Sequence, residues 1–304
     1  MGNLEDMLYK RSLSRRRFLD VAGTGAGATA ILSLTGGCSD TASSGTTTTT
    51  TPPATTTVTD TDILNFALNL EYLEAEYYLR AVTGSGLSST DAGTSAGAVT
   101  GGTQVPFKTP ALQQYAMEIA NDELAHVRFL RSALGSAAVS RPAIDLTNSF
   151  NAAALAAGIG PTFNPFADED SFVVGAFVFE DVGVTAYHGA ASLLTDKTHL
   201  AAAAGILATE AYHAGEIRTL LTQLDVPYIT YANQISALRA KAGGGAETTL
   251  SAGAIVAADS NSISYSRTTD QVLHIVYLNA TAGVVKSGGF FPNGLNGTIT
   301  ASAT

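Results

Sequence analysis

Cysteine is nearly absent from this 304-residue sequence: Cys38 is the single one, so no disulfide can form within the chain. Basic residues are also scarce, with 16 Lys and Arg against 26 Asp and Glu and a formal net charge of −10. A nucleic-acid surface needs cations that neutralise phosphates, so this balance argues against such a partner. The hydrophobic fraction of 45% is ordinary and allows one domain with a substantial core.

Long apolar runs are missing after the N-terminal region, so no later segment is predicted to span a membrane. The N-terminal region has the order of a targeting segment. Ser14–Leu19 (SRRRFL) resembles the twin-arginine export signal, and a mild apolar stretch follows from Val21 to Leu34. Residues 1–37 hold five basic and three acidic residues, so the remainder carries a formal charge of −12. We therefore expect export by the twin-arginine pathway to the periplasm or the cell surface.

Cys38 follows three small residues and resembles the lipidated cysteine of a bacterial lipoprotein. A lipidated cysteine would anchor the protein to a membrane without spanning it. Cleavage nearby, giving a soluble exported protein, is the alternative. Residues 39–60 contain eleven threonines and two prolines, which predicts an extended tether. The expected organisation is a signal with lipidated Cys38 over 1–38, the tether over 39–60, a helical bundle over 61–225 and a C-terminal extension packed on it over 226–304.

Four stretches with acidic residues inside apolar helical stripes organise the rest of the chain. Two of them carry the pattern Glu-x6-Tyr and two carry Glu-x-x-His, in alternation. Intervals of three and seven residues keep the members of each pair on one face of a helix. The pairs are, in order, Glu71 with Tyr78, Glu123 with His126, Glu180 with Tyr187, and Glu210 with His213.

Apolar periodicity predicts a helix around each of these pairs. Two copies of one helical hairpin would result, with a Gly-rich loop over 83–108 inside the first copy and a long crossover over 135–168 between them. The predicted fold class is an all-α four-helix bundle of two pseudo-repeated hairpins with an irregular C-terminal extension. In that extension, residues 235–242 could form a short helix, and 272–278 is an apolar run of open type. The four bundle helices are expected over 61–82, 110–134, 170–195 and 198–224.

Carboxylates buried in a bundle core are very costly unless cations compensate them. Two divalent metal ions would match the four glutamates in charge, and the two imidazoles would bind as neutral ligands. Donor sets that are rich in oxygen with some nitrogen suit iron or manganese better than copper or zinc. The sequence therefore predicts a two-metal site of iron or manganese, without choosing between them, that is open to dioxygen or peroxide.

In the order and spacing of these residues, the chain resembles the ferritin-like superfamily. The stretch Gly289-Phe290-Phe291-Pro292 is similar to its exported, desiccation-related branch. The resemblance implies that Glu71 and Glu180 are terminal ligands, that Glu123 and Glu210 bridge, and that His126 and His213 each hold one metal. It also implies that Tyr78 and Tyr187 lie beside the metals. For these two tyrosines a catalytic role and simple core packing both stay open.

The remaining candidates have simpler explanations. Glu74 and Glu216 lie one turn from predicted ligands and could each be an extra ligand or an acid that supports one, but an exposed helix face is the favoured interpretation for both. His188 lies off the apolar stripe and is interpreted as structural. Tyr77 and Tyr212 are interpreted as packing residues.

We predict a membrane-tethered dimetal oxidoreductase that acts on dioxygen or hydrogen peroxide in oxidative or desiccation stress. Ferroxidase-, peroxidase- and catalase-like activities stay open, as does a homodimer. The alternative is a non-catalytic protein that binds metal or protects the envelope. A third hypothesis, iron storage, would require a hollow assembly.

Overall fold

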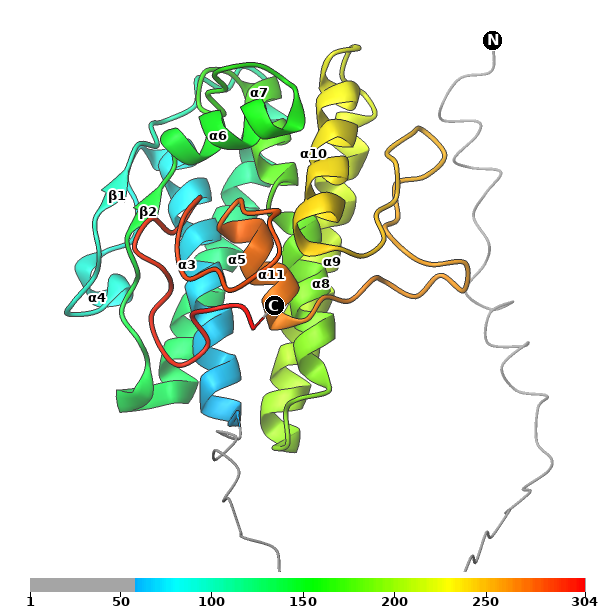
Figure 1. Ribbon diagram of the computed structural model, residues 1–304. Coiled ribbons are helices and arrows are strands. Elements are labelled where there is room, and N and C mark those ends of the chain that lie inside the picture. The colour runs from blue at the N-terminus through cyan, green and yellow to red at the C-terminus, as the bar shows by residue number, and fades with distance from the viewer. Residues whose placement is uncertain (1–57, 304) are drawn as a thin grey trace, which may run out of the picture. The chain divides into compact units, whose positions relative to one another are not determined.

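The computed structural model describes residues 58–303, which form a bundle of two helical hairpins (Figure 1). In the first hairpin α3 (Asp60–Thr83) packs along α5 (Pro110–Leu134), and in the second α8 (Glu180–Ala191) packs along α9 (Lys197–Leu221). The predicted all-α four-helix architecture is therefore confirmed. Within 58–303 no helix is both long and apolar enough to cross a membrane. The predicted signal, Cys38 and most of the predicted tether lie outside the described residues.

The starts of α3 and α5 are set by capping. Thr59 and Asp62 form a reciprocal capping box at the start of α3. Pro110 lies in the first turn of α5, where backbone amides have no acceptor within the helix, so the lack of an amide hydrogen costs nothing. The side chain of Thr109 does not cap this helix; its amide instead donates to the Glu169 carboxylate at 2.9 Å. The start of α5 is thus held by Glu169, which precedes the second hairpin.

The third helix corrects the sequence prediction. One helix was predicted over 170–195, but the chain forms α7 (Glu169–Phe177) and then α8, which ends at Ala191. At the break, the Phe179 amide donates to the Ala176 carbonyl at 2.9 Å, three residues back rather than four. Glu180 therefore begins a new helix instead of continuing one.

Contacts from residues beyond 225 explain this break. Arg239 donates to the carbonyl oxygen of Phe177, and its guanidinium carbon lies 4.5 Å from the centroid of the Phe177 ring. The ring of Phe179 packs edge-on against Phe290, with centroids 5.0 Å apart. These partners are distant in sequence, so the periodicity of residues 170–195 carries no sign of them.

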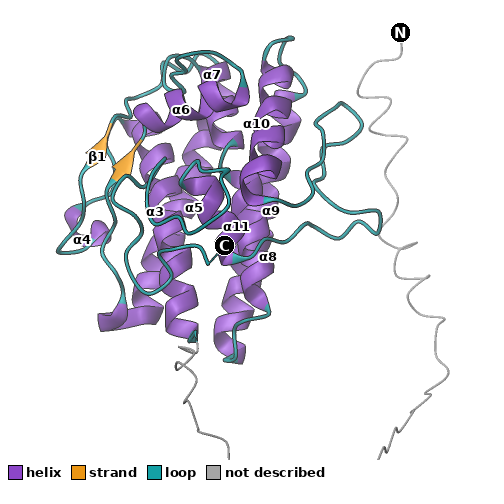
Figure 2. Cartoon of the chain, in the orientation of Figure 1, coloured by secondary structure: helices purple, strands orange, loops and turns teal. Residues whose placement is uncertain are grey.

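The two long connections of the bundle pack on each other (Figure 2). The loop after α3 contains α4 (Ser89–Ala92) and β1 (Val99–Thr100). The crossover after α5 contains η1 (Gly135–Ala137), β2 (Ile144–Asp145) and α6 (Asn148–Ala157). Strands β1 and β2 pair in parallel, with Val99 opposite Ile144. The segment expected as a plain loop is thereby joined to the crossover by a short sheet.

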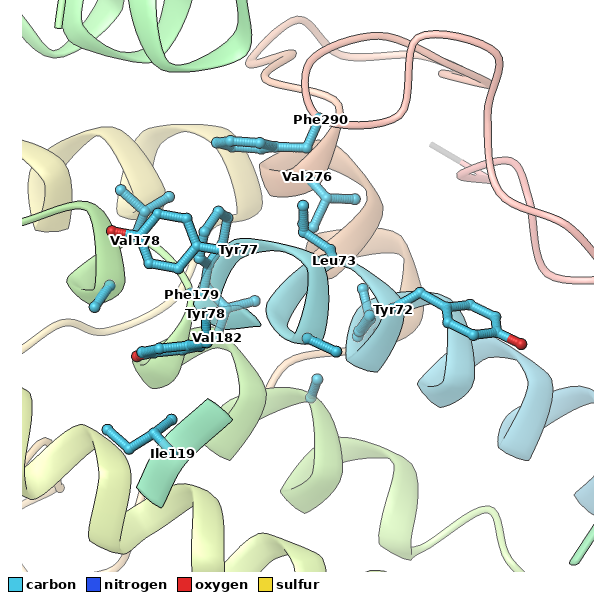
Figure 3. Close-up of a cluster of buried hydrophobic side chains, with 14 of the residues drawn as sticks. Tyr72, Leu73, Tyr77, Tyr78, Ile119, Val178, Phe179, Val182, Val276 and Phe290 are labelled. Carbon is cyan, nitrogen blue, oxygen red and sulfur yellow. The ribbon is translucent and has the colours of Figure 1, made fainter. Parts of the chain in front are cut away.

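The chain beyond 225 covers one side of the bundle with two further helices. The short helix expected over 235–242 begins earlier, as α10 (Tyr228–Gly243), and the apolar run is helical, as α11 (Thr269–Val276). Figure 3 shows Phe290 and Val276 of this region facing Tyr77 and Leu73 of α3. The Phe290 ring also contacts that of Phe150 at 5.2 Å. The C-terminal region therefore buries a face of α3 that would otherwise meet water.

An arginine clamps the two helices of each hairpin at equivalent places. Arg131 lies five residues after His126 and donates at 2.6 Å to the hydroxyl of Tyr72, the residue after Glu71. Arg218 lies five residues after His213 and donates at 2.7 Å to Asp181, the residue after Glu180. In each hairpin, an arginine on the Glu-x-x-His helix thus bonds to the residue after the glutamate of the partner helix, Glu71 or Glu180.

Replacing Tyr72 by phenylalanine is expected to lower the free energy of unfolding by about 1–3 kcal/mol. The hydroxyl accepts from Arg131 and donates to the carbonyl of Val139 at 3.0 Å, and its loss leaves both groups short of a partner. Urea unfolding would measure the change, with Tyr115→Phe as the control because Tyr115 is exposed. Equal stability of the two variants would contradict a role for the first clamp.

Candidate metal centre

The six residues predicted as metal ligands meet in the middle of the bundle. Each of the four bundle helices (α3, α5, α8 and α9) contributes a glutamate, and α5 and α9 add a histidine one turn later. All six side chains are buried, although four are ordinarily charged. They are Glu71 on α3, Glu123 and His126 on α5, Glu180 on α8, and Glu210 and His213 on α9.

These side chains form two sets of donor atoms that share two members. The ligand atoms within each set lie within 4.8 Å of one another, which is compatible with a metal ion at each. Glu123 and Glu210 belong to both sets, as bridging ligands must. One set adds Glu71 and His126, and the other adds Glu180 and His213.

The polar atoms of this cluster fit a pair of cations better than they fit one another. His213 Nδ1 lies 3.0 Å from Glu123 Oε1, yet neither atom makes a hydrogen bond of acceptable geometry. Both oxygens of Glu123 and of Glu210, and Oε2 of Glu180, are likewise buried without a hydrogen-bond partner among the described residues. Orphaned buried polar atoms are rare in proteins, and two cations would satisfy this set.

Proton binding shows how strongly the cluster needs positive charge. Burial raises the pKa of Glu71 to about 7 and that of Glu180 to about 8, and it holds the pKa of Glu210 well above its usual range. Burial alone would lower the pKa of each imidazole, but neighbouring carboxylates raise that of His126 to about 11 and that of His213 to about 10. Without metal, the cluster therefore holds protons that divalent ions would displace.

The two predicted tyrosines contact the glutamate of the opposite hairpin. Tyr78 on α3 donates its hydroxyl hydrogen to Glu180 Oε1, and Tyr187 on α8 donates to Glu71 Oε1. The second oxygen of Glu180 has no hydrogen-bond partner among the described residues, and the second oxygen of Glu71 lies 3.1 Å from His126 Nδ1. The pair thus links the two halves of the site.

Three further residues surround the cluster: Asp122 and Gly183, which the sequence interpretation did not single out, and Glu74, for which it favoured an exposed face. The Asp122 carboxylate accepts from His213 Nε2 at 3.2 Å and so orients that ring. Glu74 is 5% exposed rather than lying on an exposed face, and burial together with the charge of Glu123 raises its pKa well above the usual range. Gly183 leaves room for both, since a Cβ there would lie 2.2 Å from Glu210 Oε2 and 3.4 Å from Glu74 Oε1.

The other candidates lie outside the cluster. His188 pairs through Nδ1 with the carbonyl of Tyr265 at 3.1 Å, and Glu216 is half-buried. Tyr77 is buried and donates to the carbonyl of Phe172 at 2.7 Å. The interpretation of Tyr212 as a packing residue is wrong, because its side chain is 79% exposed.

Replacing Asp122 by asparagine is expected to weaken metal affinity by about 10- to 100-fold, the usual effect of removing a partner that orients a ligating histidine. Asp122 is the one described acid that reaches His213 from outside the cluster, and asparagine keeps its size without its charge. Competition with a chelator would measure the affinity. Glu118→Gln on the exposed face of α5 is the control, and equal affinity in both variants would rule out this role.

Comparison with known proteins gives a consistent picture. The family model described as a ferritin-like domain matches residues 59–223. Desiccation-related protein PCC13-62 of Craterostigma plantagineum is 32% identical over 242 residues, which cover 71% of this chain and 76% of that protein. Ferritin-like catalase Nec2 of Nesocodon mauritianus is 30% identical over 268 residues, which cover 79% of this chain and 84% of that protein.

Proposed function

The chain belongs to the ferritin-like domain family, and from this premise we propose that it is a dimetal oxidoreductase acting on hydrogen peroxide or dioxygen. The observation that carries the proposal is the pair of buried donor sets sharing Glu123 and Glu210. A relative of 30% identity is named a ferritin-like catalase, which favours peroxide as the oxidant.

Each residue of the cluster has a part in this proposal. Glu71 and His126 would hold one metal ion, Glu180 and His213 the other, and the two shared glutamates both. Bound iron or manganese would supply the redox chemistry, since each ion exchanges electrons with a small oxidant. Tyr78 and Tyr187 keep Glu180 and Glu71 oriented through their hydroxyls.

Glu74 supplies a further chemical group beside this cluster. Burial and the charge of Glu123 raise its pKa well above the usual range, which favours the protonated carboxyl, and Glu74 lies near Glu210 across the gap left by Gly183. A carboxylic acid held in this way can give a proton to a nearby oxygen atom.

Consumption of hydrogen peroxide by the metal-loaded full chain tests the proposal. We expect oxygen release or peroxide loss that needs iron or manganese and disappears in a Glu123→Ala variant of unchanged helical content. An oxygen electrode and peroxide absorbance would follow the reaction. If the metal-loaded protein consumes neither peroxide nor dioxygen, the proposal of an oxidoreductase is refuted.

The second candidate is a non-catalytic protein that binds metal or protects against drying. The name of the 32% identical relative, a desiccation-related protein, favours it. In that case the metal pair would only hold the four helices together. Metal would then raise the thermal midpoint of the protein without any turnover of oxidant.

We also propose that the protein is exported and lipid-anchored in this role. The twin-arginine pathway carries folded proteins, so iron or manganese could be bound before export, away from zinc and copper that bind such sites more tightly. Metabolic labelling with palmitate would test the anchor. Label on the wild type that is lost in Cys38→Ser supports it, and an unlabelled wild type would refute it.

A further inference from the structure

An apolar cavity opens beside the cluster, between α5 and α9. We call it the apolar chamber; it has a volume of about 280 Å³. Its walls include Leu64, Phe129, Leu130, Ala202 and Ile206, and none of its lining residues is an aspartate, glutamate, lysine or arginine. Leu130 and Ile206 lie one helical turn from His126 and Glu210, so the chamber is next to the ligands.

Tyr187 joins the chamber to the cluster. Its side chain forms part of the chamber wall, and its hydroxyl donates to Glu71. Tyr187 is 6% exposed, whereas its counterpart Tyr78 has no exposure. Of the two equivalent tyrosines, only Tyr187 therefore retains some contact with solvent and lines a cavity.

A second cavity, of about 800 Å³, occupies the matching place at the other end of the site, but its chemistry differs. The apolar chamber is lined by Phe129, three residues after His126. At the equivalent position, three residues after His213, this cavity is lined by Glu216. Glu169 and Asp170 also line it, and Tyr78 does not. The two hairpins repeat in backbone, yet one cavity is apolar and the other acidic.

We propose that the apolar chamber binds the organic part of a compact, uncharged hydroperoxide, about one aromatic ring in size, and places its O–O group next to Tyr187 and Glu71. This inference rests on the proposed function for the presence of a peroxide group. An apolar cavity of about 150 Å³ lined by Leu, Ile and Phe already takes up benzene, so the chamber has room for a substituted ring. Hydrogen peroxide or dioxygen alone would leave most of these walls without a partner.

The walls also select against charge. Among the lining residues only His199 can carry a positive charge, and its Nδ1 already pairs with Asp60 at 3.1 Å, so an anion would have no free cationic partner in the chamber. The tyrosine hydroxyl hydrogen is already engaged with Glu71, so its oxygen is available as an acceptor. That suits the O–H donor of a hydroperoxide or of the corresponding alcohol.

The test is a calorimetric titration of the metal-loaded full chain with 2-phenylpropan-2-ol, the alcohol that corresponds to cumene hydroperoxide. The hydroperoxide itself would be titrated into chain loaded with redox-inert zinc. We expect both to bind and Ala202→Phe, which fills the chamber, to raise each Kd by at least about tenfold. Ala202→Leu, a smaller insertion, should have a lesser effect in the same direction.

Ala211→Phe is the matched control, because Ala211 lies on the same helix but lines the acidic cavity. This variant should bind like the wild type, and benzoate should bind none of the proteins. Failure of the wild type to bind either probe, an equal loss in Ala211→Phe, or equal binding of benzoate would each overturn the inference. Because these titrations need no turnover, they are separate from the peroxide assay. Probe binding without consumption of either peroxide or dioxygen would refute the oxidoreductase and leave the chamber as a site for the alcohol.

Discussion

Replacing Glu123 by alanine is expected to reduce bound iron or manganese from about two ions per chain to nearly none. Glu123 is a member of both donor sets, so its loss removes a ligand from each metal position at once. It also removes a negative charge that helps to offset the cations in a buried site. Metal analysis by mass spectrometry on protein exported by its own signal would measure the content.

Glu71→Ala provides the informative comparison, because Glu71 belongs to one donor set only. This variant should keep the metal held by the other set and so show an intermediate content. Glu118→Ala, on the exposed face of α5, should keep the content of the wild type. Two ions retained in Glu123→Ala, or equal losses in Glu71→Ala and Glu123→Ala, would contradict shared ligation.

The ligand cluster could be predicted from the sequence because helix geometry alone determines which residues share a face. Glu123 and His126 are three residues apart within an apolar stripe, and the same spacing recurs at Glu210 and His213. Such local patterns hold wherever the helix forms. The same is true of Tyr78, seven residues after Glu71, although its bond to Glu180 depends on how the hairpins pack.

What the sequence did not show depends on contacts between distant segments. Glu74 reads as an exposed residue on an amphipathic helix, yet it lines a small cavity with Val276 and Phe290. The break before Glu180 likewise needs Arg239, which reaches Phe177 from α10. The C-terminal region covers α3, so the buried surface of this helix is wider than its apolar stripe. The covering residues lie about 200 positions later in the sequence, and the periodicity of α3 cannot reveal them.

Metal-free protein is expected to lose stability as the pH rises from about 5.5 to 8, whereas metal-loaded protein should gain stability over the same range. In the folded metal-free state the pKa of Glu71 is about 7 and that of Glu180 about 8, against 4.5 for an ordinary glutamate. The stability associated with such raised pKa values is complete below 4.5 and is lost as the pH rises toward 7 and 8. Each proton kept by the folded state alone changes stability by about 1.4 kcal/mol per pH unit.

The histidines act in the same direction at higher pH. The pKa of His126 is about 11 and that of His213 about 10, against 6.5 for an ordinary histidine, so their contribution to stability falls as the pH rises above 6.5.

Bound metal reverses the dependence of stability on pH, because ions bind the deprotonated ligands and meet less competition from protons as the pH rises. Urea midpoints at pH 5.5, 6.5 and 7.5, with chelator and with metal, would measure both slopes. In a Glu71→Gln/Glu180→Gln variant, the urea midpoint of the metal-free protein should fall less steeply with pH, since glutamine cannot release a proton. A metal-free wild-type midpoint that rises with pH would show that the cluster does not hold these protons.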